Sequence, residues 1–226
     1  MRNGQDRDIS VIVPVYNEEK YVGRVIEDLL DLDLFREIIL VEDGSTDRTL
    51  SELEYFKGHE TLQILHNERN MGKGYAVSRG LKLVTAPYVV LQDGDLEYPV
   101  ENLIEIVSHL GYDMVAGVRM IKEAAIQKMT VRSFLINKMF IKLLGSPDVF
   151  TGQRMLNARF MRALNLKSRG FQLETELTVK AIKLGAKVKY VPIGYNARTA
   201  SEGKKIGPLD LFKISLAYLT LKINLF

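Results

Sequence analysis

The sequence predicts an α/β fold in which a mostly parallel central sheet is flanked by helices, and three observations support this. Short apolar runs typical of buried strands recur along the first half of the chain, at residues 9–15, 37–41, 88–91 and 114–118. Segments with apolar side chains at helical spacing lie between them, at residues 18–31, 73–84 and 99–110. A length of 226 residues with 46% hydrophobic and 26% charged side chains is that of an ordinary globular chain. Strands alternating with helices are typical of parallel sheets, which bind ligands beyond the carboxyl ends of their strands.

The alternation loosens after Arg119. The segments expected there are an apolar and basic stretch at 124–144, a further stretch at 151–166, a helix near 174–184 and a strand near 188–191. No Pro- or Gly-rich linker interrupts the chain. We therefore expect a single domain over residues 1–226, with the two halves 1–118 and 119–226.

The two halves carry opposite charge, although the net charge of the chain is only +3. Residues 1–118 contain 11 basic and 22 acidic side chains, and residues 119–226 contain 20 basic and 6 acidic ones, which gives balances of −11 and +14. The second half therefore suits an anionic partner such as a phosphate or a membrane surface, and two solvated faces are the alternative. Nucleic acid is the least favoured partner, because aromatic side chains are not interleaved with the basic ones as base stacking requires.

Several classes of protein are excluded or disfavoured. The chain has no cysteine, which excludes disulfides, thiolate metal sites and cysteine nucleophiles and favours a reducing, cytoplasmic setting. Residues 1–10 hold no apolar signal-peptide core and no run of 18 apolar residues occurs, so neither a signal peptide nor a membrane span is expected. The Walker pattern of P-loop NTPases and the glycine fingerprint of dinucleotide-binding dehydrogenases are both absent.

The sharpest local motif is Asp93-Gly94-Asp95, directly after the strand predicted at 88–91. Residues two apart in an extended segment point the same way, so both carboxylates can face one ion. Mg²⁺ is usually held by one or two carboxylates together with substrate phosphates. The motif therefore predicts a divalent cation bound with a diphosphate, and a solvated turn is the alternative.

Two further turns, one after a predicted strand and one before a predicted helix, carry polar or glycine residues that suit ligand binding. Residues 42–47 (Glu-Asp-Gly-Ser-Thr-Asp) follow the strand at 37–41, where acidic groups can accept hydrogen bonds from a base or a ribose, or cap the next helix. Residues 70–74 (Asn-Met-Gly-Lys-Gly) open a helix, and the backbone N–H groups at a helix start suit an anion.

Together these motifs resemble a known family. Inverting family 2 glycosyltransferases with a GT-A fold show the order and spacing found here at residues 14–19, 42–47, 70–80 and 93–99. Three later segments, 151–154, 171–177 and 191–206, are similar to the dolichol-phosphate mannose or glucose synthase branch of that family. The resemblance covers about residues 9–212.

The resemblance implies a set of site residues. Mg²⁺ or Mn²⁺ bridging the donor diphosphate would be surrounded by Asp93, Asp95 and Glu97. The nucleotide-sugar donor would be bound by Pro14, Tyr16, Glu18, Glu42, Asp43, Lys73 and Asp93. The catalytic and phosphate-contacting residues would be Asp95, Arg119, Arg132, Arg198 and Lys205. Two positions depart from the family, because Glu42 stands where Asp is common and Gln153 stands where an aromatic residue is usual.

The implied reaction moves a hexose from a nucleotide sugar of the GDP-mannose or UDP-glucose type to a polyprenyl or dolichyl phosphate, with inversion. A phosphate monoester has a second pKa near 6 and is mostly dianionic at pH 7, so this acceptor needs no general base. An acceptor hydroxyl would need one, and Glu174 and Glu176 are the candidates in the second half. For both glutamates, a solvated helix start is the favoured interpretation.

A polyprenyl acceptor also implies contact with a membrane. A helix over 124–144 would carry Lys128, Arg132, Lys138 and Lys142 within one arc and apolar side chains over most of the rest, which favours a bilayer interface. Residues 209–226 suit a second interfacial helix, a dimer element or the stub of a transmembrane segment. We therefore expect a peripheral protein on the cytoplasmic face of the membrane, and a homodimer is possible.

Two rival functions stay open. One is a family 2 glycosyltransferase that acts on a soluble hydroxyl acceptor. The other is a non-catalytic nucleotide-binding module associated with a membrane, since a metal motif alone does not prove turnover. The basic residues on the acceptor side argue against the second.

Overall fold

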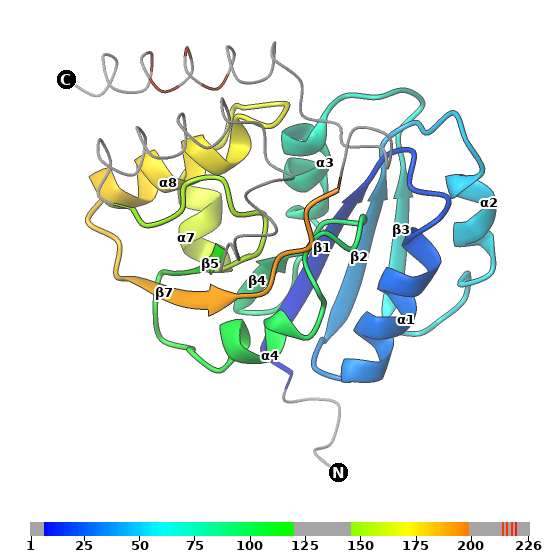
Figure 1. Ribbon diagram of the computed structural model, residues 1–226, viewed down its shortest axis with the longest axis horizontal. Helices are drawn as coiled ribbons and strands as arrows, with labels where there is room; N and C mark the ends of the chain where they lie inside the picture. The colour runs from blue at the N-terminus through cyan, green and yellow to red at the C-terminus, as the bar shows by residue number, and fades with distance from the viewer. Residues whose placement is uncertain are drawn as a thin grey trace.

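The fold is a single seven-stranded sheet with helices on both faces, seen in a computed structural model (Figure 1). The structure describes residues 7–119 and 146–198, together with the four helical residues 214, 216, 218 and 220. The predicted segment 124–144 lies outside the described residues, as does most of 209–226. No helix within the described part is both long enough and apolar enough to cross a bilayer.

The strands run in the spatial order β3-β2-β1-β4-β6-β5-β7. Their bounds are Ile9–Val15 (β1), Glu37–Glu42 (β2), Leu62–His66 (β3), Tyr88–Leu91 (β4), Met114–Arg119 (β5), Arg154–Asn157 (β6) and Val188–Ile193 (β7). All neighbouring pairs are parallel except those that involve β6, which is antiparallel to both β4 and β5. The predicted α/β fold with a mostly parallel sheet is confirmed.

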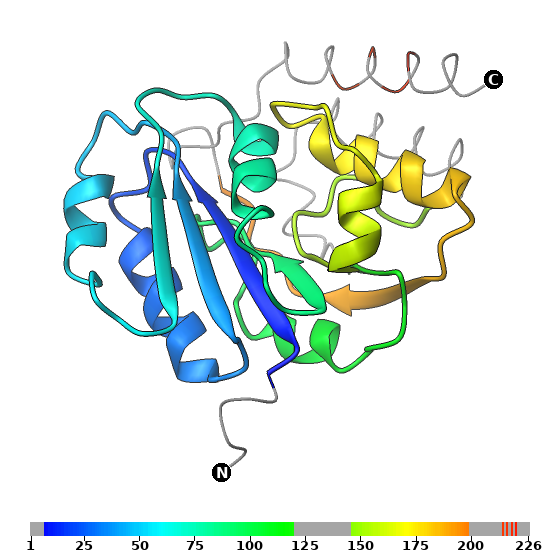
Figure 2. The same ribbon diagram turned by 180° about the vertical axis from the view of Figure 1, so that it is seen from behind.

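The described helices cover both faces of the sheet. Their bounds are Val22–Leu32 (α1), Thr49–Glu54 (α2), Lys73–Gly80 (α3), Asn102–Val107 (α4), Ala158–Ala163 (α7) and Leu173–Lys183 (α8). Figure 1 shows α1 and α4 on the near face, and Figure 2, turned by 180°, shows α3, α7 and α8 on the other. α1, α3, α4 and α8 correspond to the helices expected from the 3.6-residue spacing of apolar side chains, whereas α2 and α7 are not predicted.

Alternation of side chains along β1 explains the two layers of the core. Val11, Val13 and Val15 are buried against α1 and α4, whereas Ile12 is buried against α3 on the opposite face. Successive side chains of a strand point to opposite faces, so a central strand covered on both sides is apolar throughout. This is why residues 11–15 form a continuous apolar run.

Candidate functional site

Those predicted site residues that the structure describes lie toward the carboxyl edge of the parallel strands. β2, β1 and β4 are neighbours in the sheet, so the segments that leave Glu42, Val15 and Leu91 emerge side by side (Figure 1). Ligands of open α/β sheets bind in this position, beyond the carboxyl ends of the strands. Pro14, near the end of β1, and Tyr16, directly after this strand, are both half-buried.

Residues 93–99, called the acidic loop below, follow β4. The backbone N–H of Glu97 donates to Asp95 Oδ1 at 3.0 Å, and Leu96 between them has a φ of 57°. A non-glycine residue in this left-handed region is strained and turns the chain sharply. The backbone of Gly152 packs so closely on this loop that a Cβ there would lie 2.3 Å from Asp93 Oδ2. A glycine is therefore required beside the Asp93 carboxylate.

Arg198 is the centre of the ion pairs at the acidic loop. Its guanidinium donates to both carboxylate oxygens of Glu18, at 3.0 and 3.1 Å, and to Asp95 Oδ2 at 2.8 Å. Glu97 Oε1 accepts from the Arg198 backbone N–H at 3.0 Å, and Glu97 Oε2 accepts from the Tyr195 hydroxyl at 2.9 Å. Both Arg198 and Glu18 are buried. One arginine thus joins the segment after β1, the acidic loop and the segment after β7.

Lys73, the first residue of α3, neutralises the other end of the loop. Its Nζ lies 2.6 Å from Asp93 Oδ1 and 2.6 Å from Glu174 Oε1 on α8. Burial lowers the pKa of Lys73, but the two carboxylates raise it by more, so the pKa ends above its ordinary value and the ammonium stays charged. No motif in the sequence predicts that Glu174 lies beside Lys73.

The acidic loop nevertheless holds an excess of negative charge. Burial raises the pKa of Asp95 first, and the Asp93 and Glu97 carboxylates raise it further, whereas Arg198 lowers it. The result is a pKa of about 7 for Asp95. An additional cation at this position would relieve the repulsion among these carboxylates.

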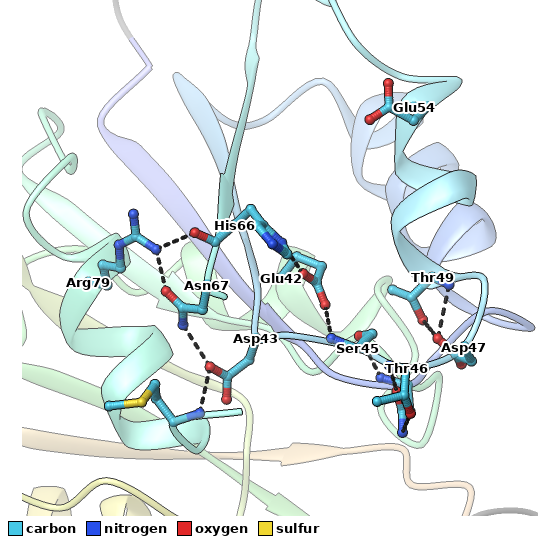
Figure 3. Close-up of polar contacts among 12 residues, drawn as sticks. Glu42, Asp43, Ser45, Thr46, Asp47, Thr49, Glu54, His66, Asn67 and Arg79 are labelled. Carbon is cyan, nitrogen blue, oxygen red and sulfur yellow. Dashed lines mark hydrogen bonds and ion pairs between the residues drawn. The ribbon is translucent and has the colours of Figure 1, made fainter. Parts of the chain in front are cut away.

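The carboxylates after β2 order the neighbouring backbone. Asp43 accepts hydrogen bonds from the Asn67 side chain at 2.6 Å and from the backbone N–H groups of Met71 and Gly72, at 3.0 and 2.7 Å (Figure 3). These bonds hold the chain that leads into α3. Gly72 there has a φ of +94°, a conformation that favours glycine.

Glu42 is fully buried and paired within the sheet. One carboxylate oxygen accepts from the backbone N–H of Ser45, and the other lies against His66 Nδ1 at the end of β3 (Figure 3). Asp47 Oδ1 accepts from the backbone N–H of Thr49, the first residue of α2, at 2.9 Å, whereas the N-cap residue Arg48 makes no side-chain capping bond. The roles of Glu42 and Asp43 toward a base or ribose stay predictions.

Arg119 is held by a buried partner. Its guanidinium makes a bidentate pair with Asp148, at 2.7 and 2.8 Å, and lies 5.1 Å from the centre of the Tyr195 ring. The role of Arg119 toward a phosphate stays a prediction. Arg132 and Lys205, the other two basic residues of the predicted set, lie outside the described residues.

The interpretation of Glu174 and Glu176 as a solvated helix start is wrong, because both are buried. Glu174 is paired with Lys73 inside the site. Glu176 accepts from the backbone N–H groups of Lys167 and Ser168 and pairs with Lys180 at 2.6 Å. Glu176 therefore orders the loop before α8, whereas Glu174 faces the acidic loop.

The side chains of the acidic loop fit a divalent cation by their chemistry. Carboxylate oxygens are the ligands that Mg²⁺ prefers, and the raised pKa of Asp95 indicates a place where positive charge is lacking. In the described part of the chain, however, no group of three or more His, Cys, Asp or Glu side chains has closed around a common centre. Instead, Asp93 is ion-paired with Lys73 and Asp95 is ion-paired with Arg198.

Known proteins resemble this chain in sequence and in fold. The model of the family described as "Glycosyl transferase family 2" matches residues 10–165. The chain is 30% identical over 209 residues to glycosyltransferase AglJ of Haloferax volcanii, covering 89% of this chain and 67% of that protein. It is 28% identical over 214 residues to a dolichol-phosphate mannosyltransferase of Pyrococcus furiosus, covering 88% of this chain and 59% of that one.

A solved structure shares the fold. Glucosyl-3-phosphoglycerate synthase from Mycobacterium tuberculosis, in complex with Mn²⁺, uridine diphosphate and phosphoglyceric acid, superposes with a TM-score of 0.71 at 22% identity. The alignment covers 97% of this chain and 78% of that one. This likeness confirms the GT-A fold that the sequence motifs imply.

Proposed function

The chain belongs to glycosyl transferase family 2, and from that premise we propose that it moves a hexose from a nucleotide sugar to a polyprenyl phosphate with inversion. The observation that carries the proposal is the acidic loop at the carboxyl edge of β4, with Lys73 and Arg198 bound to its carboxylates. The similarity to a dolichol-phosphate mannosyltransferase supports the choice of acceptor.

Each segment of the edge has a part in this proposal. Pro14, Tyr16, Glu42 and Asp43 line the nucleoside side. Asp93, Asp95 and Glu97 would hold Mg²⁺ or Mn²⁺, which would supply charge neutralisation to the departing diphosphate. Lys73 and Arg198, released from some of their carboxylate contacts, offer donors to the phosphate oxygens.

The chemistry needs little beyond orientation and charge. An oxygen of the acceptor phosphate forms a bond to the anomeric carbon on the face opposite the leaving group, and the bond to the nucleoside diphosphate breaks with its electron pair. No proton has to be removed from the nucleophile, because a phosphate monoester is mostly dianionic at pH 7. The cations of the site hold two anions together and stabilise the charge that develops on the leaving group.

A transfer assay tests this function. The chain is incubated with Mn²⁺, a panel of radiolabelled nucleotide sugars and a polyprenyl monophosphate in vesicles, and the lipid fraction is counted. We expect label in the lipid with one class of nucleotide sugar, and none after chelation of the metal. Label that appears only on soluble hydroxyl acceptors would contradict the proposal that the acceptor is a polyprenyl phosphate. Binding of the nucleotide sugar without any transfer would favour a non-catalytic module.

A hydroxyl acceptor is the second candidate, and the position of Glu174 favours it. This glutamate is buried and lies 2.6 Å from Lys73 Nζ, which also pairs with Asp93, so it is a carboxylate next to the proposed donor site. Losing a general base costs about 10²–10⁴-fold in rate. If the acceptor is a phosphate, we expect Glu174→Gln to lower kcat by less than about tenfold, because the amide still accepts a hydrogen bond from Lys73.

Glu176→Gln is the matched control for that variant. It lies two residues further along α8 and pairs with Lys180 and the loop backbone. We expect it to lower the unfolding midpoint while kcat of the folded fraction stays near that of the parent chain. If kcat falls by more than about 10²-fold in folded Glu174→Gln but not in Glu176→Gln, the result would favour the hydroxyl acceptor instead.

We also propose that the second half attaches peripherally to the cytoplasmic face of a membrane. Ile182 and Leu184 at the end of α8 expose apolar side chains, the latter 62% exposed, next to Lys183. Basic side chains near an anionic surface contribute about 1 kcal/mol each. A homodimer stays a prediction.

Co-sedimentation with vesicles checks this attachment. We expect more of the chain to pellet with anionic than with neutral vesicles, and Leu184→Asp to reduce the bound fraction several-fold. The matched control is Leu110→Asp, at an exposed leucine after α4 on the other face of the sheet. Equal binding of both variants would show that this end of α8 does not touch the membrane.

A further inference from the structure

Three amide side chains form a continuous chain of hydrogen bonds beneath the acidic loop. Gln92 immediately precedes the loop, Gln153 immediately precedes β6, and Asn102 is the first residue of α4. Gln92 and Gln153 are completely buried, and Asn102 is half-buried. We refer to these three side chains as the amide relay.

The bonds of the amide relay run in one direction. Asn102 Nδ2 donates to Gln153 Oε1 at 2.8 Å, and Gln153 Nε2 donates to Gln92 Oε1 at 2.6 Å. The remaining N–H groups donate to backbone carbonyls: Asn102 to Gly194 at 3.0 Å, Gln153 to Pro99 at 2.9 Å, and Gln92 to Asp93 and Tyr98, both at 3.0 Å. Every amide N–H therefore has an acceptor, and every amide oxygen has a donor, since Asn102 Oδ1 accepts from the Gly194 N–H at 3.0 Å. Turning one amide over would break the bonds of its neighbours.

The acidic loop needs such support. Its Leu96 is in a left-handed conformation, and its neighbouring carboxylates repel one another. Strained backbone of this kind persists only where the surrounding structure over-determines it. The relay binds the carbonyls of Asp93, Tyr98 and Pro99, which lie at the two ends of the loop.

The other end of the relay holds the segment that carries Arg198. Asn102 makes a two-way pair with the backbone of Gly194, next to Tyr195. Tyr195 in turn donates to Glu97, and the Asn196 backbone N–H donates to the Glu97 carbonyl at 2.7 Å. The relay thus links the two backbone segments whose side chains meet in the Arg198–Asp95 ion pair.

We propose that the amide relay of Gln92, Gln153 and Asn102 is a positioning device that sets the spacing between the acidic loop and Arg198 for binding the diphosphate of the donor. The inference rests on the proposed function and adds positioning residues to it. None of the three amides has to touch the donor. Their effect is transmitted through the carbonyls they bind.

A double-mutant cycle on the full chain tests this. The variants are Gln92→Met, Gln153→Met and the double variant, and calorimetry measures the binding of GDP and UDP with Mn²⁺ alongside the unfolding midpoint. Each single variant leaves buried polar groups unpaired and should weaken nucleoside diphosphate binding roughly tenfold. Because either change breaks the relay, the double variant should bind about as well as either single variant.

Two further variants keep the test decisive. Asn102→Asp, at the half-buried end of the relay, keeps the bond from the Gly194 N–H but cannot donate to Gln153, so it should weaken binding even if the methionine variants fold poorly. Gln63→Met removes an exposed amide that donates to Glu37 at 3.4 Å, away from the site, and should leave binding unchanged.

The outcomes separate this inference from the function on which it rests. If the parent chain binds neither nucleotide, the proposed function fails and the positioning role fails with it. If the parent chain binds but the relay variants bind equally well, only the positioning role is overturned. Losses in affinity that add in the double variant would likewise show that the amides do not act as one unit. A lower unfolding midpoint with unchanged affinity would indicate a purely structural network.

Discussion

Replacing Asp95 with asparagine is expected to lower the rate of transfer by at least about 10²-fold and to weaken Mn²⁺-dependent binding of nucleoside diphosphates. The amide keeps the volume of the side chain and can still accept from the Glu97 N–H, so the acidic loop keeps its shape. What is lost is the negative charge on an oxygen that faces Arg198 and, in the proposed site, the cation. The measurements are kcat/KM with saturating acceptor and calorimetry with and without Mn²⁺.

The same variant is expected to be at least as stable as the parent chain at pH 8 in the absence of metal. The pKa of Asp95 is about 7 in the folded chain, against an ordinary value near 4. A raised carboxyl pKa means that the folded state binds the proton more tightly, so this group's contribution to stability is present at low pH and is lost as the pH rises from about 4 through 7. Asparagine does not titrate, and the unfolding midpoint should fall less over that interval.

Asp33→Asn is the matched control for this variant. Asp33 is also paired with an arginine, Arg7, but lies exposed after α1, away from the acidic loop. It should change neither transfer nor nucleotide binding. Unchanged Mn²⁺-dependent binding in Asp95→Asn would exclude Asp95 from the proposed cation site.

The fold could be predicted because its signals are local. β1, β2, β4 and β5 are mostly buried, and each contains a continuous run of apolar residues, although β2 begins and ends with a glutamate and β5 ends with Arg119. β6 is not predicted, because it begins with Arg154 and only Met155 and Leu156 of its four residues are apolar. The buried Arg154 guanidinium donates to the Val149 and Thr151 carbonyls and to Thr178 Oγ1. No pattern in the sequence predicts this arrangement.

The site could be predicted only where its residues are close in the chain. Asp93 and Asp95 lie two positions apart, so they can be recognised as a motif from the sequence alone. The family resemblance implies Lys73 and Arg198 as site residues, but their direct pairing with Asp93 and Asp95 is not predicted, since Arg198 lies 103 positions from Asp95 and 180 from Glu18. The pairing of Lys73 with Glu174 likewise depends on how α3 and α8 pack on the same face of the sheet. A charged residue at a helix start, such as Glu174, is expected to be exposed. The sequence does not show which parts of the chain cover that helix, so the burial of Glu174 could not be predicted.

Arg198→Met is expected to have the largest combined effect on stability and binding. Arg198 is 8% exposed and contacts Glu18 through two bonds and Asp95 through one, so its loss leaves buried carboxylates without their counter-charge. Breaking a buried ion pair by removing one partner typically costs about 3–5 kcal/mol of the free energy of unfolding. Urea denaturation measures this loss directly.

The loss of stability should depend on pH in a defined direction. Arg198 lowers the pKa of Asp95, so removing it raises that pKa above about 7. Protonation then removes the unpaired charge as the pH falls, and the deficit in unfolding free energy should be smaller at pH 5 than at pH 8. A deficit that is the same at both pH values would show that lost packing, rather than lost charge, is the cause.

Arg198→Lys separates the charge from the geometry of the guanidinium. Lysine keeps the positive charge but cannot make the bidentate contact with Glu18 while also donating to Asp95 in the same plane. We expect it to recover much of the stability lost in Arg198→Met, yet to bind nucleoside diphosphate with Mn²⁺ at least tenfold more weakly than the parent chain. Full recovery of binding by lysine would mean that the site requires only a positive charge at this position, and the proposed donor contacts of the guanidinium would then be wrong.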